Sequence, residues 1–342
     1  MMDHKTPSGQ RLYDPFGIPG PESLEGFIGQ RQPVASLRLA IQACKERAEC
    51  LDHVLLSGPP GLGKTTLARL IAKELSCALR VTSGPAIERQ GELAAILTHL
   101  NERDVLFIDE IHRLKKPLEE LLYTAMEQFA LDVIIGEGPK AKAVRLPLSR
   151  FTLIGATTRQ GLLSAPLRSR FALGFHLDFY EPEDLGRILA AYAKQWGVAM
   201  SHDALQELSG CSKGTPRVGL SLLKRVRDYA QVFQAGLIDE ELVGAALALN
   251  GVDSNGLESM DRKILSVMIE KFHGGPVGIE TLASAIMEEK DTIEDVYEPY
   301  LLREGIIHKT QRGRVVTEKG YAVMACPPKP LPRTGKGLFD NS

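Results

Sequence analysis

With 342 residues, of which 44% are hydrophobic and 25% are charged, the chain is long enough for two or three globular domains. A formal net charge of −2 excludes a general electrostatic attraction to nucleic acid, so any DNA contact has to come from a local basic patch. The five cysteines show no zinc-like spacing, and no apolar run reaches the roughly 20 residues of a membrane span. We therefore expect a cytoplasmic protein with reduced thiols and no membrane partner.

The N-terminal region contains few signals for packed structure. Prolines and glycines recur through residues 1–22, which we expect to form an extended arm. A helix is predicted over residues 33–50, because Val34, Leu37 and Ile41 would lie on one face of it.

A phosphate-binding loop follows this helix. Residues 58–65 match the pattern G-x-x-x-x-G-K-[ST], after an apolar strand and before a helical pattern. Gly61 and Gly63 would let backbone N–H groups turn towards nucleotide phosphates, Lys64 would meet their charge, and Thr65 would bind Mg²⁺. A strand-to-helix turn that binds nothing is the alternative, but such a turn does not require the Lys-Thr pair.

A second signal is the stretch over residues 104–110, in which the apolar run 105–108 ends in Asp109 and Glu110. Such a run is typical of a strand that is buried on both faces, and its carboxyl end would lie at the same sheet edge as the phosphate loop. Asp109 would then hold Mg²⁺ through water, and Glu110 would polarise the attacking water. By itself the pattern also fits a strand that ends in a solvated turn.

A third strand is predicted over residues 151–157, and Thr158 follows it. Its hydroxyl could contact the attacking water or the γ-phosphate, or it could cap the next loop. An arginine in the segment 166–171 could be a surface charge, or a finger that reaches the nucleotide of a neighbouring subunit. The alternation of strands and helices predicts a parallel sheet with helices on both faces.

Between the second and third signals, residues 131–148 form two apolar segments around a Gly/Pro turn, which predicts a hairpin. The hairpin could extend the sheet. If it protrudes, Val133, Ile135 and Val144 would form an exposed apolar patch that marks a partner, whereas Lys140 and Lys142 leave DNA contact open.

The last third of the chain is mostly helical. Residues 184–250 show helical stripes that suit a small lid, with Arg217 at the start of one helix, where it could sense the γ-phosphate or simply be exposed. Helices at 261–270, 280–287 and 292–302, followed by two short strands, predict a winged helix.

The wing is the better candidate for DNA contact in this domain. The third helix carries several carboxylates that DNA phosphates would repel, whereas the wing carries Lys309, Arg312 and Arg314. Contacts there would be with the DNA backbone and would carry little sequence information. A solvated basic hairpin without a ligand is the alternative.

These motifs occur in the order and spacing of AAA+ ATPases. The longer stretches 104–114, 151–159, 214–217, 291–299 and 312–314 resemble the RuvB family, the bacterial motor subunits that drive branch migration of Holliday junctions together with RuvA. The resemblance runs from Leu24 to Tyr321.

The resemblance implies an α/β AAA+ P-loop ATPase domain with a parallel sheet, a small helical lid domain and a C-terminal winged-helix domain. We place them at 23–183, 184–254 and 255–322, with a disordered tail at 323–342. It also implies a homo-hexameric ring that uses ATP and Mg²⁺, acts on DNA in recombination and repair, binds RuvA through the hairpin 131–148, and could contact RuvC. The rivals are a clamp loader or replication initiator of the AAA+ class, and a DNA-binding regulator that uses ATP only as a switch.

Site residues follow from the same resemblance. It implies that Arg170 is a finger that acts in trans. The other residues that it implies for nucleotide binding, metal binding and hydrolysis are Lys64, Thr65, Thr66, Asp109, Glu110, Glu127, Gln128, Phe129, Thr158, Tyr180 and Arg217. It further implies that Lys290, Lys309 and Arg314 contact DNA, with lysine at two positions where the family more often has arginine. Pro19-Gly20-Pro21 lacks the arginine that usually borders the adenine pocket, and Gln128 and Ser169 replace residues that are usually acidic.

Overall fold

The computed structural model describes residues 20–135, 142–233 and 236–327. The chain divides into two compact units, Met1–Tyr180 and Glu181–Ser342, which we call unit 1 and unit 2. Among the described residues, no helix combines the length and the apolar character that crossing a membrane would need.

Unit 1 is built on a parallel sheet of five strands in the order β2-β3-β6-β1-β7. The strands are β1 (Val54–Ser57), β2 (Leu79–Ser83), β3 (Val105–Asp109), β6 (Thr152–Thr157) and β7 (Leu173–His176). β1 and β6 are buried along their whole length, as expected for apolar strands that are covered on both faces. The predicted parallel α/β sheet is thereby confirmed.

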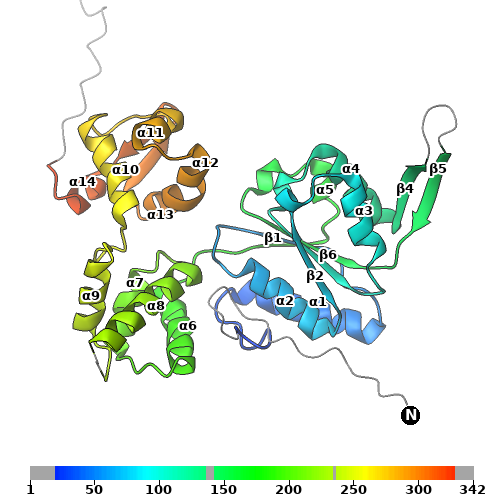
Figure 1. Ribbon diagram of the computed structural model, residues 1–342, viewed down its shortest axis with the longest axis horizontal. Helices are drawn as coiled ribbons and strands as arrows, with labels where there is room; N and C mark the ends of the chain where they lie inside the picture. The colour runs from blue at the N-terminus through cyan, green and yellow to red at the C-terminus, as the bar shows by residue number, and fades with distance from the viewer. Residues whose placement is uncertain (1–19, 136–141, 234–235, 328–342) are drawn as a thin grey trace, which may run out of the picture. The chain divides into compact units, whose positions relative to one another are not determined.

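Helices cover both faces of this sheet (Figure 1). α1 (Arg31–Arg47) and α2 (Lys64–Leu75) lie on one face, and α3 (Gln90–Thr98), α4 (Lys116–Gln128) and α5 (Ala165–Arg168) lie on the other. α1 ends before the predicted residue 50, because Ala48 adopts a left-handed conformation and its N–H closes the helix on the carbonyls of Cys44 and Lys45. The core between the sheet and α3 and α4 includes Leu93, Leu122 and Phe151.

The predicted hairpin is present as β4 (Ala130–Ile135) paired antiparallel with β5 (Lys142–Pro147). It forms a separate two-stranded sheet and projects from unit 1 (Figure 1), so it does not extend the five-stranded sheet. Val144 is half-buried. The side chains of the other predicted patch residues, Val133 and Ile135, and of Lys142 are not described, and Lys140 lies outside the described residues.

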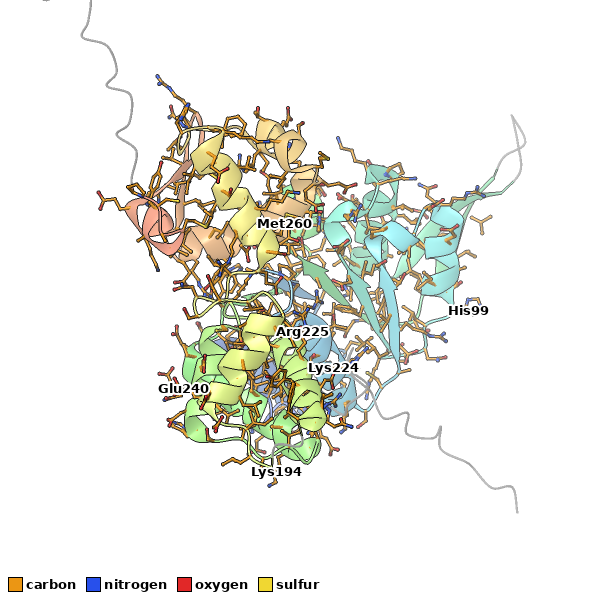
Figure 2. All side chains as sticks on the ribbon, turned by 60° about the vertical axis from the view of Figure 1, so that its left-hand side comes forward. His99, Lys194, Lys224, Arg225, Glu240 and Met260 are labelled. Carbon is orange, nitrogen blue, oxygen red and sulfur yellow. The ribbon has the colours of Figure 1, made fainter. Side chains whose placement is uncertain are left out.

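The first part of unit 2 is a helical lid. Its helices are α6 (Pro182–Gln195), α7 (His202–Gly210), α8 (Pro216–Val232) and α9 (Glu240–Leu249). Ser201, Thr215 and Asp239 cap α7, α8 and α9 by accepting hydrogen bonds from backbone N–H groups in the first turns. Lys194, Lys224, Arg225 and Glu240 are exposed on these helices (Figure 2).

The second part of unit 2 is the predicted winged helix. It comprises α10 (Ser259–Glu270), α11 (Ile279–Ile286), α12 (Lys290–Thr292), the π-helical turn η5 (Ile293–Tyr297), α13 (Glu298–Arg303), the wing strands β8 (Ile307–Thr310) and β9 (Gly313–Val316), and α14 (Glu318–Val323). The predicted third helix is thus interrupted by a π turn, which sequence periodicity does not reveal. Leu265, Met268 and Leu301 are fully buried in the core of this domain.

Candidate functional site

The loop between β1 and α2 has the conformation of a phosphate cradle. Gly58, Gly61 and Gly63 adopt positive φ angles of 132°, 82° and 98°. At Gly58 a side chain is also excluded by space, because a Cβ there would lie 2.3 Å from the carbonyl oxygen of Leu177. The loop leads into the N-terminus of α2, where backbone N–H groups and the helix dipole favour an anion.

Lys64 places its ammonium group inside this loop. The side chain is buried, and Nζ donates hydrogen bonds of 2.8 Å to the carbonyl oxygens of Gly58 and Pro59. Thr65 and Thr66 follow in the first turn of α2 and are half-buried. A buried ammonium, two hydroxyls and a helix N-terminus fit a nucleoside triphosphate with its Mg²⁺ ion.

The two predicted acids lie at the carboxyl end of β3. Asp109 is the last residue of the strand, and its Oδ1 accepts a 2.9 Å hydrogen bond from the N–H of Glu110. Glu110 has a left-handed backbone conformation, with φ of 46°, and its Oε2 accepts a 3.2 Å hydrogen bond from Arg113. Both carboxylates are half-buried, which leaves them accessible to water and a metal ion.

The end of β6 connects the loop to the acids. β6 lies between β1 and β3, and the Thr157 carbonyl accepts a 3.2 Å hydrogen bond from the N–H of Gly58. The Thr157 hydroxyl lies 3.0 Å from His112 Nδ1 and accepts a hydrogen bond from the N–H of Arg159. Thr158 follows directly. The structure therefore gathers the predicted Lys64, Thr65, Asp109, Glu110 and Thr158 at one edge of the sheet, which we call the carboxyl edge. Thr157 and His112 belong to the motifs quoted above, but they were not among the predicted site residues.

Tyr180 and two residues of the segment before α1, Phe27 and Gly29, complete the surroundings of the loop. Tyr180 is buried, and its hydroxyl donates a 3.3 Å hydrogen bond to the Leu62 carbonyl. Its ring packs against Gly29, where a Cβ would lie 2.4 Å from the ring. Phe27 packs against Gly63 in the same way, because a Cβ on Gly63 would lie 3.1 Å from the ring of Phe27. Phe27 belongs to no recognisable motif. Pro19, the first residue of the segment that lacks the usual arginine of the adenine pocket, lies outside the described residues.

The predicted finger lies elsewhere in unit 1. Arg170 donates a 2.7 Å hydrogen bond from Nη2 to Glu127 Oε2, and its guanidinium lies 5.5 Å from the centre of the Tyr123 ring. Its buried Nε has no hydrogen-bond partner among the described residues. Arg170 and the end of α4 thus form one ordered group.

His53 shows where this group sits on the sheet. It immediately precedes β1, and its Nε2 lies 3.3 Å from the carbonyl oxygen of Met126 while its Nδ1 accepts a 2.9 Å hydrogen bond from the N–H of Leu153. The ring centre lies 6.2 Å from that of Phe129. Burial lowers the pKa of His53 below its ordinary value, so the neutral ring is favoured.

The segment of Glu127, Gln128 and Phe129 therefore lies with Arg170, the predicted finger, towards the amino ends of the strands, which we call the amino edge. Gln128 there accepts a hydrogen bond from Arg145. β7 begins three residues after Arg170, and Leu173 pairs with Val54 at the start of β1. The phosphate loop follows the other end of β1, roughly 13 Å away for four residues of strand. The structure does not bring this group to the loop of its own chain.

Arg217 is the second residue of α8, on the lid, and is exposed. On the winged helix, Lys309 and Arg312 are exposed in the wing, and Lys290 begins α12. The ammonium of Lys309 lies 4.0 Å from Glu294, and that of Lys290 lies 3.8 Å from Glu280. These exposed pairs are weak.

Arg314 lies differently from the exposed basic residues of the wing. The structure buries its guanidinium instead of presenting it on the wing, with 7% of the side chain exposed. Nε donates a 2.6 Å hydrogen bond to Glu298, and Nη2 donates to Glu298 and Glu294 at 3.0 and 2.9 Å. These hydrogen bonds raise the pKa of Arg314 above its ordinary value. The predicted contact with DNA phosphate would require the arginine to leave both carboxylates.

Three family models together match most of the chain. They are described as the Holliday junction DNA helicase RuvB P-loop domain (residues 20–177), the RuvB AAA lid domain (180–253) and the RuvB C-terminal winged helix domain (254–325).

Individual proteins agree with these models. The Holliday junction branch migration complex subunit RuvB of Clostridium kluyveri is 56% identical over 320 residues, covering 91% of each chain. The subunit of the same name from Rubrobacter xylanophilus is 53% identical over 307 residues, covering 90% of this chain and 86% of the relative. Among solved structures, the Thermotoga maritima RuvB Holliday junction branch migration motor matches with a TM-score of 0.83 at 48% identity, covering 90% of this chain and 98% of that one.

Proposed function

Because the chain belongs to the RuvB family of AAA+ ATPases, we propose that it is an ATP-driven motor that moves Holliday junctions as a hexameric ring together with RuvA. The observation that carries the proposal is the separation of the two edges of the sheet. The phosphate loop and the two acids lie at one edge, and Arg170 lies with Glu127 towards the other. A complete site then needs two subunits.

At the carboxyl edge, Lys64, Thr65 and Thr66 would hold the nucleotide phosphates. Thr65 would bind Mg²⁺ directly and Asp109 through its water shell. Bound MgATP supplies the phosphoryl group and a metal charge that neutralises developing negative charge. Glu110 would orient and polarise the attacking water, with Thr158 as the sensor that contacts that water or the γ-phosphate.

The amino edge would serve the neighbouring subunit. Arg170 would stabilise the charge that develops on the transferred phosphoryl group, as arginine fingers do. The segment Glu127, Gln128 and Phe129 would reach the same nucleotide, because the ion pair between Glu127 and Arg170 holds them in one group. Tyr180 would line the nucleotide, and Arg217 would convert loss of the γ-phosphate into a rotation of the lid.

The DNA contacts proposed are Lys290, Lys309 and Arg312, which are accessible in unit 2. Arg314 joins them only if Glu294 and Glu298 release it. The projecting hairpin β4–β5 would dock on RuvA. We place the protein in the cytoplasm, where it would act in recombination and repair, with RuvC as a further partner.

Branch migration of a synthetic four-way junction, with and without RuvA and ATP, tests this proposal. We expect migration only when both are present, together with steady-state phosphate release that RuvA and junction DNA stimulate. A clamp loader or initiator would not respond to RuvA. A nucleotide-operated switch would release no phosphate at steady state. Either result would overturn the proposal.

A further inference from the structure

A buried ion pair joins the two domains of unit 2. Lys213 lies in the loop between α7 and α8, and its side chain is 10% exposed, whereas Asp261, in the first turn of α10, is fully buried. Lys213 Nζ donates a hydrogen bond to Asp261 Oδ2. Because two charges removed from water are costly to separate, this pair holds the lid loop to the winged helix.

Tyr300, in α13, places its aromatic ring against the ammonium group of Lys213. Lys213 Nζ lies 5.5 Å from the centre of this ring, and the Arg303 guanidinium lies 5.4 Å from it. Arg303 also donates a 3.5 Å hydrogen bond from Nη1 to the carbonyl oxygen of Lys213. The lid loop is therefore held, through its own side chain and its own backbone, by side chains from two helices of the winged helix.

The linker between the two domains is also packed tightly. At Gly256, whose φ is 70°, a Cβ would lie 2.6 Å from the carbonyl oxygen of Cys211. The Cys211 thiol donates to the Asp253 carbonyl at 3.6 Å, and Arg262 of α10 lies 2.7 Å from the Asp253 carboxylate. The linker thus has little freedom to act as a hinge.

The loop that carries Lys213 leads directly to Arg217. Lys213 has a left-handed backbone, with φ of 51°, and Thr215 caps α8, where Arg217 is the second helical residue. We propose that Lys213 is a positioning residue that couples Arg217 to the winged helix, so that the lid and the DNA-binding domain turn as one body. The inference rests on the proposed roles of Arg217 and of the wing.

One atom of the pair allows a sharper test. Asp261 Oδ1 is buried and has no hydrogen-bond partner among the described residues, since Lys213 and the N–H of Glu258 both donate to Oδ2. An arginine has a planar fork of donors that can engage both carboxylate oxygens. Lys213→Arg should therefore preserve the coupling, whereas Lys213→Met should break it.

The coupling can be measured on the full chain in two ways. Spin labels carried by unnatural amino acids at Lys194 of α6 and Met287, which is 92% exposed at the end of α11, report the distance between the domains. The second readout is the number of junction steps per ATP hydrolysed with RuvA. For the wild type and Lys213→Arg we expect one narrow distance distribution that is the same with ADP and with a non-hydrolysable ATP analogue.

Lys213→Met should broaden that distribution and lower the steps per ATP by about fivefold or more, while ATP turnover stays within about twofold. Asp261→Asn, which keeps the hydrogen bond from Glu258, should show a weaker form of the same change if Lys213→Met does not fold. An unchanged distribution, or a parallel loss of turnover and migration, would overturn the inference. If the wild type moved no junction, the proposed function would fail, and the distance distributions would still test the rigid connection.

Discussion

The two edges of the five-stranded sheet are assembled in different ways. At the carboxyl edge, functional groups lie at the end of a strand or just after the loop that follows it, as Asp109 and Lys64 do. At the amino edge, His53, Glu127 and Arg170 come from distant parts of the chain and are joined by hydrogen bonds and ring contacts. The carboxyl edge has the phosphate loop and the two acids but not Arg170, whereas the amino edge has Arg170 but neither the loop nor the acids. This difference supports the proposal that neighbouring copies of the chain together form one catalytic site.

Arg170→Ala is expected to have the largest effect on this divided site. Loss of the finger should lower ATP turnover by about 1000-fold while nucleotide binding changes little, because the phosphate loop belongs to the other edge. Steady-state phosphate release and equilibrium nucleotide titration measure the two properties. Arg168→Ala, at an exposed position in α5, is the matched control and should retain turnover.

Mixing two inactive variants sharpens the same prediction. In rings made from Arg170→Ala and Glu110→Gln subunits, some interfaces contain an intact finger and an intact acid. We expect such mixtures to hydrolyse ATP well above the sum of the separate variants. Full activity of Arg170→Ala alone, or no gain on mixing, would show that the finger does not act in trans.

Glu110→Gln should have the next largest effect. The amide keeps the shape of the side chain but cannot polarise water as a base, so the rate of hydrolysis should fall about 100-fold. ATP should stay bound, because the phosphate contacts do not involve this residue. Single-turnover hydrolysis with prebound ATP measures the step, and rapid release of ATP from the variant would contradict the assignment.

The sequence revealed the carboxyl edge because its chemistry is local. The phosphate loop and the pair Asp109 and Glu110 are contiguous motifs that follow apolar runs, and parallel strands must present such ends together. The amino edge has no such rule. Glu127 and Arg170 are 43 residues apart, and only the family resemblance suggested a shared role for them. His53 was missed, because a histidine before a strand carries no signal until its partners are known.

Arg314 shows the same limitation in the winged helix. A basic residue in a predicted wing indicates an exposed contact, but Glu294 and Glu298 lie 20 and 16 residues away and enclose it only through tertiary packing. The π turn at Ile293–Tyr297 was also beyond reach, because it breaks a helical period that the apolar residues continue. Fold class and domain type, in contrast, followed from periodicity and motif order.

Glu127→Gln should have a smaller effect than loss of the finger itself. The amide can still accept a hydrogen bond from Arg170, but the charge that orients the guanidinium is lost. We expect turnover to fall roughly fivefold, since the pair is partly exposed and solvent weakens it. Glu120→Gln, on the exposed face of the same helix, is the control. An equal loss in both variants would mean that Glu127 does not position the finger.

His53 provides the smallest predicted effect and a test of how the amino edge is held to β1. Its pKa is lowered by burial, so the folded chain binds the proton less readily than the unfolded chain, whose histidine titrates near 6.5. Its contribution to stability is therefore complete above pH 6.5 and is lost as the pH falls towards the lowered pKa, by at most about 1.4 kcal/mol per pH unit.

Protonation of Nδ1 would remove the acceptor for the N–H of Leu153. His53→Gln should lower the thermal midpoint of the full chain at pH 7.5, and the gap to the wild type should narrow at pH 5.5, because only the wild type loses stability by protonation there. His99→Gln, at an exposed position at the C-terminal end of α3, should show no such convergence. Calorimetry at the two pH values measures both gaps. A gap for His53→Gln that is the same at both pH values would mean that the neutral ring does not hold Met126 and Leu153 together, and the amino edge would then depend on the ion pair of Arg170 alone.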